Sequence, residues 1–229
     1  MPSIPILPNA YEGPPSIDRS SIPAEEMPSF LHIQTLLAEL GVYERHLLLA
    51  VYLYEYGDQA AREITDFAKL ELALWTTGGW QSIAARDGAM TIYHFGCAID
   101  GIKNSLPASP TLNAKIDRRK LKDAGNVFKS SFPGYLALRH VVAHVADFSQ
   151  TLEKKTSHAV KGPFTKGLFR SDDPKGVTWL GGNMNGCTYA VTYEGEAFTY
   201  DLNRESVTKL RSIKDRIYSA FAGAGKNEA

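Results

Sequence analysis

Apolar residues recur at helical spacing along most of the chain from residue 29 onward. They predict helices over residues 29–41, 42–56, 58–75, 80–105, 113–129 and 131–149. We expect Gly41 to weaken or end the first helix and Gly78-Gly79 to break the third, because glycine is unfavourable inside a helix. Asp58 and Ser131 are expected N-caps, since short polar side chains accept hydrogen bonds from the unpaired amides of a first turn.

The C-terminal part of the chain combines a hairpin with a last amphipathic helix. Two runs of alternating apolar residues within 187–202 flank Glu194-Gly195 and predict a β-hairpin. Asn203 is the expected cap of a final helix, whose apolar stripe contains Val207, Leu210, Ile213, Ile217 and Phe221. Residues 152–185 are rich in lysine, glycine, serine and aspartate and predict a long loop.

These patterns predict an all-α fold, a helical bundle with one inserted β-hairpin. Seven of the 12 prolines lie in residues 1–28, which therefore cannot form a helix and are expected to be an extended arm. The expected domain spans residues 29–222, with the hairpin at 187–202 and a flexible tail at 223–229.

Composition adds few constraints to this picture. The 229 residues are 44% hydrophobic and 22% charged, as in ordinary soluble globular proteins. The longest apolar run, Leu47 to Tyr54, has eight residues, well below the roughly 18–20 needed to cross a bilayer. No signal peptide is recognisable before Arg19, and Cys97 and Cys187 lack the spacing of metal ligands. We expect a cytoplasmic protein with reduced thiols that does not bind a membrane.

The net charge of zero conceals a strong asymmetry along the chain. Residues 1–112 carry six Lys/Arg and thirteen Asp/Glu, a balance of −7, whereas residues 113–176 carry thirteen and six, a balance of +7. The second segment predicts either a positive surface that attracts a polyanion or a solvated helix face with no such role. Its basic helix supplies the candidate substrate-binding residues Arg118, Arg119, Lys120 and Lys122.

One helix carries most of the candidate chemistry. Its sequence is Leu138-Arg139-His140-Val141-Val142-Ala143-His144-Val145-Ala146-Asp147. His140 and His144 are one turn apart on the same face. In one interpretation the histidines pack in the bundle and the arginine pairs with an acid. In a second they bind a metal, although Val141 stands where an H-E-x-x-H motif has its glutamate. In a third, Arg139 binds phosphate oxygens and a histidine transfers protons, without a metal.

Arg139-His140-x-x-x-His144 resembles the R-x4-6-H signature of HEPN domains, which are bundles of four to five helices with the signature in a late helix. The resemblance implies a metal-independent endoribonuclease that forms a homodimer and needs no cofactor. Arg139 would bind the scissile phosphate, His144 would act as general acid and base, and His140 would orient the phosphate or assist the proton transfer. The 2′-hydroxyl would attack, leaving a 2′,3′-cyclic phosphate, so RNA and not DNA would be cut.

Other acidic and histidine side chains are weaker candidates. Asp87 and His94 lie on nearby turns of the helix expected at 80–105, and Asp147 follows His144 by three residues. Any of them is a candidate to orient the arginine or the histidines, or to form an ordinary pair within its helix.

The leading hypothesis is therefore RNA cleavage, in a toxin or defence setting with a cognate antitoxin or regulatory protein as partner. The alternative is a non-catalytic, dimeric HEPN-like module that binds a nucleotide or a protein. A third possibility is an interaction protein in which the motif only stabilises the dimer.

Overall fold

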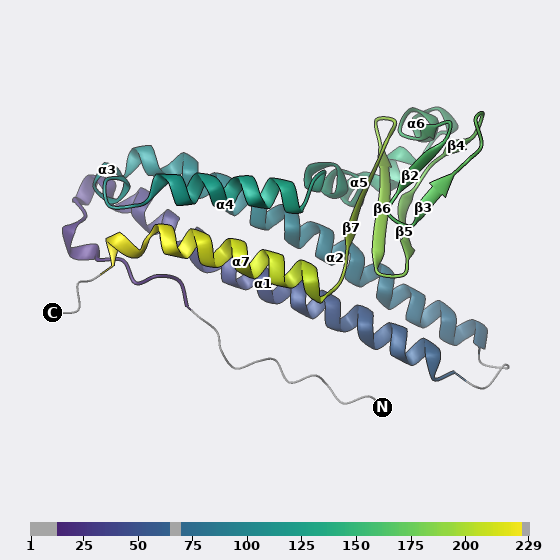
Figure 1. Ribbon diagram of the computed structural model, residues 1–229, viewed down its shortest axis with the longest axis horizontal. Helices are drawn as coiled ribbons and strands as arrows, with labels where there is room; N and C mark the ends of the chain where they lie inside the picture. The colour runs from purple at the N-terminus through teal and green to yellow at the C-terminus, as the bar shows by residue number, and fades with distance from the viewer. Residues whose placement is uncertain (1–12, 65–69, 226–229) are drawn as a thin grey trace. The chain divides into compact units, whose positions relative to one another are not determined.

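The computed structural model describes residues 13–64 and 70–225, which divide into two compact units. Among these residues, unit 1 contains 47–64, 70–93 and 132–206, and unit 2 contains 13–46, 94–131 and 207–225. Two helices, α1 (Met27–Arg62) and α2 (Leu70–Ser105), contribute to both units. Figure 1 shows both helices.

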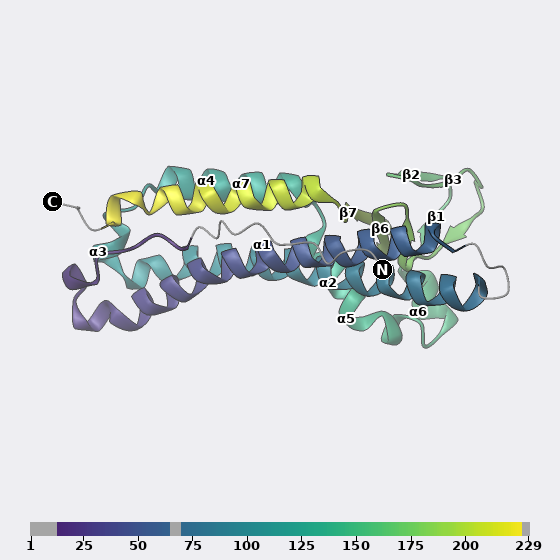
Figure 2. The ribbon, with the colours of Figure 1, turned by 90° about the horizontal axis from the view of Figure 1, so that it is seen from below.

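Unit 2 is helical. It contains the first part of α1, the last part of α2, and the helices α3 (Pro110–Asn113), α4 (Arg118–Ser131) and most of α7 (Arg204–Ala220). Short 3-10 turns lie at Arg19–Ser21, Ala24–Glu26, Leu106–Ala108 and Ala222–Ala224. Helices α4 and α7 lie side by side in both views (Figure 1 and Figure 2).

The core of unit 2 joins these helices through buried apolar faces. Phe95 of α2 stacks on Phe128 of α4, with ring centroids 5.7 Å apart. The hydroxyl of Tyr218 on α7 donates a hydrogen bond of 2.9 Å to the carbonyl oxygen of Leu37 on α1. The stripe predicted for the last helix is buried along its whole length. Its predicted cap is confirmed, because the Asn203 side chain accepts from the Ser206 amide at 2.9 Å.

Unit 1 combines helices with three small antiparallel sheets. Its further helices are α5 (Tyr135–Phe148) and α6 (Leu152–Ser157). One sheet has the order β5-β6-β7, formed by Gly181–Asn185, Thr188–Tyr193 and Glu196–Asp201. The other sheets pair β1 (Val160–Lys161) with β4 (Val177–Thr178), and β2 (Phe164–Lys166) with β3 (Phe169–Ser171).

The three-stranded sheet packs against helices within unit 1. Helix α5 contacts all three strands, and β6 is buried along nearly its full length. The hairpin predicted at 187–202 is confirmed, with Tyr189 opposite Tyr200 and Val191 opposite Phe198. The Tyr200 hydroxyl donates to the carbonyl oxygen of Ala85 on α2, which ties the hairpin to that helix.

The prediction of an all-α fold is wrong, because the described residues also contain seven strands, five of them in the segment 152–185 that was expected to be a loop. Those strands are short and carry little alternation of apolar residues. The strand β5 is held mainly by its neighbour, since the edge of β6 offers unpaired backbone groups that β5 completes. The fold is mixed α and β, with helices predominating.

Several predicted helix boundaries are also wrong. Helix α1 continues through Gly41 and past Asp58, whose carboxylate pairs with Arg62 at 2.8 Å in the last turn instead of capping a new helix. Helix α2 continues through Gly78-Gly79. Close packing of α1 on α2 next to this dipeptide offsets the cost of glycine, about 1 kcal/mol each. The rings of Tyr56 and Trp80, for example, lie 5.4 Å apart.

Two boundaries differ near the candidate chemistry. The basic helix begins at Arg118 and not at residue 113, because α3 ends there and a turn follows. Ser131 ends α4 and caps no helix. The residue before α5 is Gly134, which adopts the left-handed conformation at φ 79°.

The described part of the expected N-terminal arm belongs to unit 2, and it is not extended throughout, because it contains two 3-10 turns and α1 begins at Met27. Ile17 and Ile22 are buried, and Ile17 forms a β-bridge with Gly225 near the end of the described chain. Residues 1–12 of the arm and 226–229 of the expected tail lie outside the described residues. Within the described ranges, no helix combines the length and the apolar character needed to cross a membrane.

Candidate functional site

The Arg/His motif lies on helix α5, which is packed in unit 1 by one of its sides. Its apolar side, with Tyr135, Leu138 and Val141 among its members, is buried in unit 1. Since residues four apart share a face, this packing leaves His140 and His144 together on a half-exposed side of the helix. His144 itself has non-helical backbone angles (φ −125°, ψ 16°), so the helix is distorted at this histidine.

The motif histidines belong to a larger group of rings, which we call the ring cluster. It consists of His140, His144, Phe148, His158 and Tyr193. The ring centroids of His140 and His144 are 5.0 Å apart, and that of His140 is 4.9 Å from Tyr193. His158 stacks on Tyr193 at 5.1 Å and lies 4.2 Å from Phe148. Three imidazoles therefore share one partly exposed site.

Two hydrogen bonds determine which ring nitrogens carry protons in neutral histidines. The Nδ1 atom of His144 lies 3.3 Å from a carboxylate oxygen of Asp147, which can only accept. The His144 proton is therefore on Nδ1, and Nε2 is an acceptor. The backbone amide of Glu194 donates to Nδ1 of His158 at 3.3 Å, so the proton of His158 is on Nε2. The cluster thus contains one imidazole ready to accept a proton and one ready to donate a hydrogen bond.

The electrostatic environment keeps His140 neutral. Burial lowers the pKa of His140 below its ordinary value, and the nearby His144, Arg139 and His158 lower it further. Glu194 opposes this shift without cancelling it. At neutral pH His140 is consequently a hydrogen-bonding group and not a cation.

Arg139 points to a different neighbour. Its guanidinium carbon lies 5.2 Å from the ring centroid of Tyr93 on α2, a cation–π contact within unit 1. Its Nε atom is buried without a hydrogen-bond partner. The arginine acts on the ring cluster through its charge, which helps to lower the pKa of His140.

The three weaker candidates have different surroundings. Asp147 is the partner of His144, as the sequence suggested. Asp87 lies on α2 in unit 1, where its charge raises the pKa of the buried Tyr200, whose main perturbation is burial. His94 belongs to unit 2, and its ring centroid lies 5.7 Å from that of Tyr43.

The four basic candidates all lie on α4 in unit 2, and all are exposed. Arg118 donates from Nε to the side-chain oxygen of Asn113 at 2.7 Å, and Lys120 lies 4.0 Å from Asp117. Arg118 and Lys122 line a hollow at the start of α4, whereas Arg119 and Lys120 do not.

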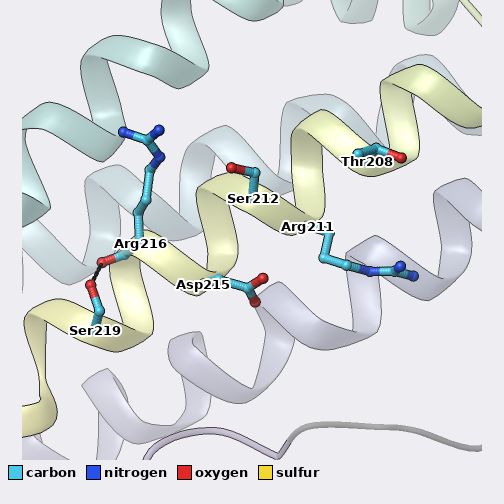
Figure 3. Close-up of a pocket in the computed structure, with 6 residues that line it drawn as sticks. All are labelled: Thr208, Arg211, Ser212, Asp215, Arg216 and Ser219. Atoms are coloured by element: carbon cyan, nitrogen blue, oxygen red, sulfur yellow. Dashed lines mark hydrogen bonds between the residues drawn. The ribbon is translucent and has the colours of Figure 1, made fainter.

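A second hollow lies along α7 and is shown in Figure 3. Its lining residues are spaced as one helix face: Thr208, Arg211, Ser212, Asp215, Arg216 and Ser219. Arg211 is engaged by Glu44 at 2.6 Å, and Ser219 donates to the carbonyl oxygen of Arg216 at 2.8 Å. The lining offers no histidine or thiol for proton transfer or nucleophilic attack, so the ring cluster is the better candidate for chemistry.

The interpretation of His140 and His144 as metal ligands requires further ligands nearby. Within residues 13–64 and 70–225, no three His, Cys, Asp or Glu side chains are grouped so that they could hold a metal ion. No protein-family model, curated protein or solved structure matches the chain. The candidate site therefore rests on the geometry of its residues.

Sequence reasoning missed His158. His158 was hidden in a segment expected to be a loop, and it follows α6 directly. Tyr193 ends β6 beside the Glu194-Gly195 turn, where both turn residues have positive φ.

Proposed function

We propose that the chain is a metal-independent endoribonuclease of the HEPN type whose chemistry takes place at the ring cluster. The observation that carries this proposal is the Asp147–His144 pair beside the neutral His140, on the half-exposed side of α5. RNA cleavage without a metal requires a proton acceptor and a proton donor at one phosphate, and imidazole is suited to both tasks near neutral pH.

The proposed reaction uses His144 twice. Its Nε2 removes the proton of the RNA 2′-hydroxyl, whose oxygen attacks the adjacent phosphorus. The bond from phosphorus to the 5′-oxygen breaks, and His144 returns the proton to that oxygen. The products are a 2′,3′-cyclic phosphate and a 5′-hydroxyl end. Asp147 keeps His144 in the required tautomer, and His140 donates a hydrogen bond to a phosphate oxygen.

Binding of RNA would use stacking and charge. Phe148, His158 and Tyr193 form a half-exposed group of rings on which a base can stack, a contact worth about 1–3 kcal/mol. Arg139 contributes positive charge beside the site, and its buried, unpaired Nε is a hydrogen-bond donor that a small movement would offer to phosphate.

The resemblance that motivates the proposal also implies a homodimer. Light scattering measures the mass directly, and the proposal expects twice the mass of one chain.

The decisive experiment follows cleavage of a mixed RNA in EDTA by the wild type and by His144→Ala, Arg139→Ala and Asp147→Asn. We expect cleavage to persist in chelator and to leave cyclic-phosphate ends. The loss should be about 10²–10⁴-fold for His144→Ala, similar for Arg139→Ala, and smaller for Asp147→Asn, which retains an acceptor oxygen. DNA should not be cut.

His32→Ala is the matched control, because His32 is an exposed histidine on α1 in unit 2. It should retain full activity. Cleavage that requires added metal, or that is equal in the wild type and His144→Ala, would show the proposal to be wrong. The non-catalytic binding module would then become the leading hypothesis.

A further inference from the structure

The hollow at the start of α4 combines an apolar floor with a basic rim, and all of it lies within unit 2. Its volume is about 270 Å³. The floor is formed by Leu106, Pro107 and Leu121, of which the two leucines are almost fully buried. The size is near the lower end of small-molecule pockets, at roughly 300 Å³.

Three cations line the rim, and no carboxylate is among the lining residues. They are Lys103 of α2 and Arg118 and Lys122 of α4. Arg118 and Lys122 are four residues apart on one helix, where like charges repel by about 0.2–0.5 kcal/mol. An anion bound between the three cations removes this repulsion, so the free hollow is electrostatically suited to a negatively charged ligand.

Lys103 and Arg118 are positioned by the surrounding protein. The Lys103 side chain is 31% exposed, and its ammonium lies against Gly125, where a Cβ would be only 2.1 Å from Nζ. Burial lowers the pKa of Lys103, Lys129 lowers it further, and Asp100, 3.8 Å away, opposes the shift. Arg118 is held by its bond to Asn113, which also lines the hollow. Because these side chains are already partly ordered, they lose less conformational entropy when a ligand binds.

We propose that this hollow binds a phosphate monoester of mononucleotide size, with its phosphate on Lys103, Arg118 and Lys122 and its apolar part on the leucine and proline floor. A phosphate monoester carries nearly two charges at neutral pH and offers three acceptor oxygens. The arginine fork and two ammonium groups match that acceptor set. The floor favours a ligand with an apolar portion, because inorganic phosphate alone would leave the exposed ring of Pro107 uncovered.

Titration calorimetry on the full chain tests the proposal with four probes: AMP, adenosine, inorganic phosphate and the dinucleoside monophosphate ApA. AMP should bind tightest, because it alone has both a terminal phosphate and a ring. ApA contains a phosphodiester with one charge, as in an RNA backbone. If ApA or adenosine binds as tightly as AMP, the hollow does not recognise a phosphate monoester and the proposal is wrong.

Variants locate the site. Arg118→Gln and Lys122→Gln should each weaken AMP binding about tenfold or more, as expected for lost hydrogen bonds to a charged group. Lys103→Met keeps the apolar stem and should have a similar effect. Arg119→Gln is the matched control, since Arg119 is an exposed cation on α4 that does not line the hollow.

An equal loss in Arg119→Gln would assign the binding to general charge attraction and overturn the proposal. Thermal unfolding of each variant shows whether the fold is retained, and if Arg118→Gln unfolds it is replaced by the milder Arg118→Lys. The measurement uses no RNA cleavage, so its outcome is independent of the proposed ribonuclease.

Discussion

Glu44 of α1 holds two cations of α7 in the interior of unit 2. Its carboxylate accepts from Lys214 Nζ and from Arg211 Nε, both at 2.6 Å. The side chains of Glu44 and Lys214 are only 9% and 6% exposed, whereas Arg211, seen in Figure 3, is 48% exposed. Asp215 also approaches Lys214 at 3.5 Å, but it is half-exposed. Lys214 therefore depends mainly on Glu44 for its neutralisation.

Glu44→Gln removes the charge that compensates the buried ammonium. Breaking a buried pair by loss of one partner costs about 3–5 kcal/mol, a large part of the usual total of about 5–15 kcal/mol. With about 2–4 °C per kcal/mol for a chain of this size, the melting temperature should fall by roughly 6–20 °C. Replacing both partners, as in Glu44→Leu with Lys214→Met, should restore most of the lost stability, because no buried charge then remains unpaired.

The assay is urea unfolding followed by far-ultraviolet circular dichroism. Glu55→Gln is the matched control, since Glu55 binds Arg204 at 2.5 Å with the same chemistry but both side chains are 42–52% exposed. An exposed pair contributes about 0–1 kcal/mol, so this variant should be nearly neutral. If Glu44→Gln lowers the free energy of unfolding by no more than Glu55→Gln does, burial does not determine the strength of these pairs and the argument is refuted.

Two further predictions concern unit 1. Gly134→Ala should destabilise the protein by more than Gly195→Ala in urea unfolding, because both glycines have positive φ but only at Gly134 would a Cβ lie 2.3 Å from the Phe198 ring. Equal losses would show that backbone strain, about 1–2 kcal/mol, is the whole effect. Burial raises the pKa of Tyr189 to about 12, above the value near 10 of an unfolded chain, so stability should be full below pH 10 and fall by about 3 kcal/mol as the pH rises through 12. The fall should be smaller in Tyr189→Phe, and an identical pH dependence in that variant would contradict the assignment.

Local signals in the sequence were sufficient for the hairpin and the last helix. The Glu194-Gly195 turn determines the register of its two strands, in which Tyr193 lies opposite Glu196. Asn203 caps α7 by a hydrogen bond within three residues. In both cases the residues that decide the structure are adjacent in the chain, so no knowledge of the tertiary fold was needed.

Signals that depend on distant partners were misinterpreted. Gly78-Gly79 was expected to break a helix, but α1 packs beside it: a Cβ on Gly57 would lie only 3.2 Å from the carbonyl oxygen of Thr77. Strand β5 contains two glycines and two asparagines, a composition typical of turns. It is a strand because β6 pairs with it and because Leu180 just before it bonds to Thr192 at both its amide and its carbonyl.

The candidate site likewise depends on one local signal and on contacts between distant segments. The motif spacing predicted that His140 and His144 share a face of α5, and their rings lie 5.0 Å apart. Helical periodicity says nothing about which other segments meet that face. His158 and Tyr193 reach it from beyond α6 and from the tip of the hairpin, and both contacts depend on how α5 packs on the sheet.

Arg139 has either a structural role or a role in binding phosphate, and the two can be distinguished by experiment. A buried guanidinium nitrogen without a partner costs about 1–3 kcal/mol, and the cation–π contact with Tyr93 returns about 0.5–2 kcal/mol of it. If packing were the arginine's whole role, its loss would change stability and leave RNA cleavage intact. If phosphate binding is its role, activity falls while the melting temperature changes little. Measuring both quantities on Arg139→Ala therefore separates a structural arginine from one that acts on phosphate, and does so at the residue on which the HEPN resemblance depends most.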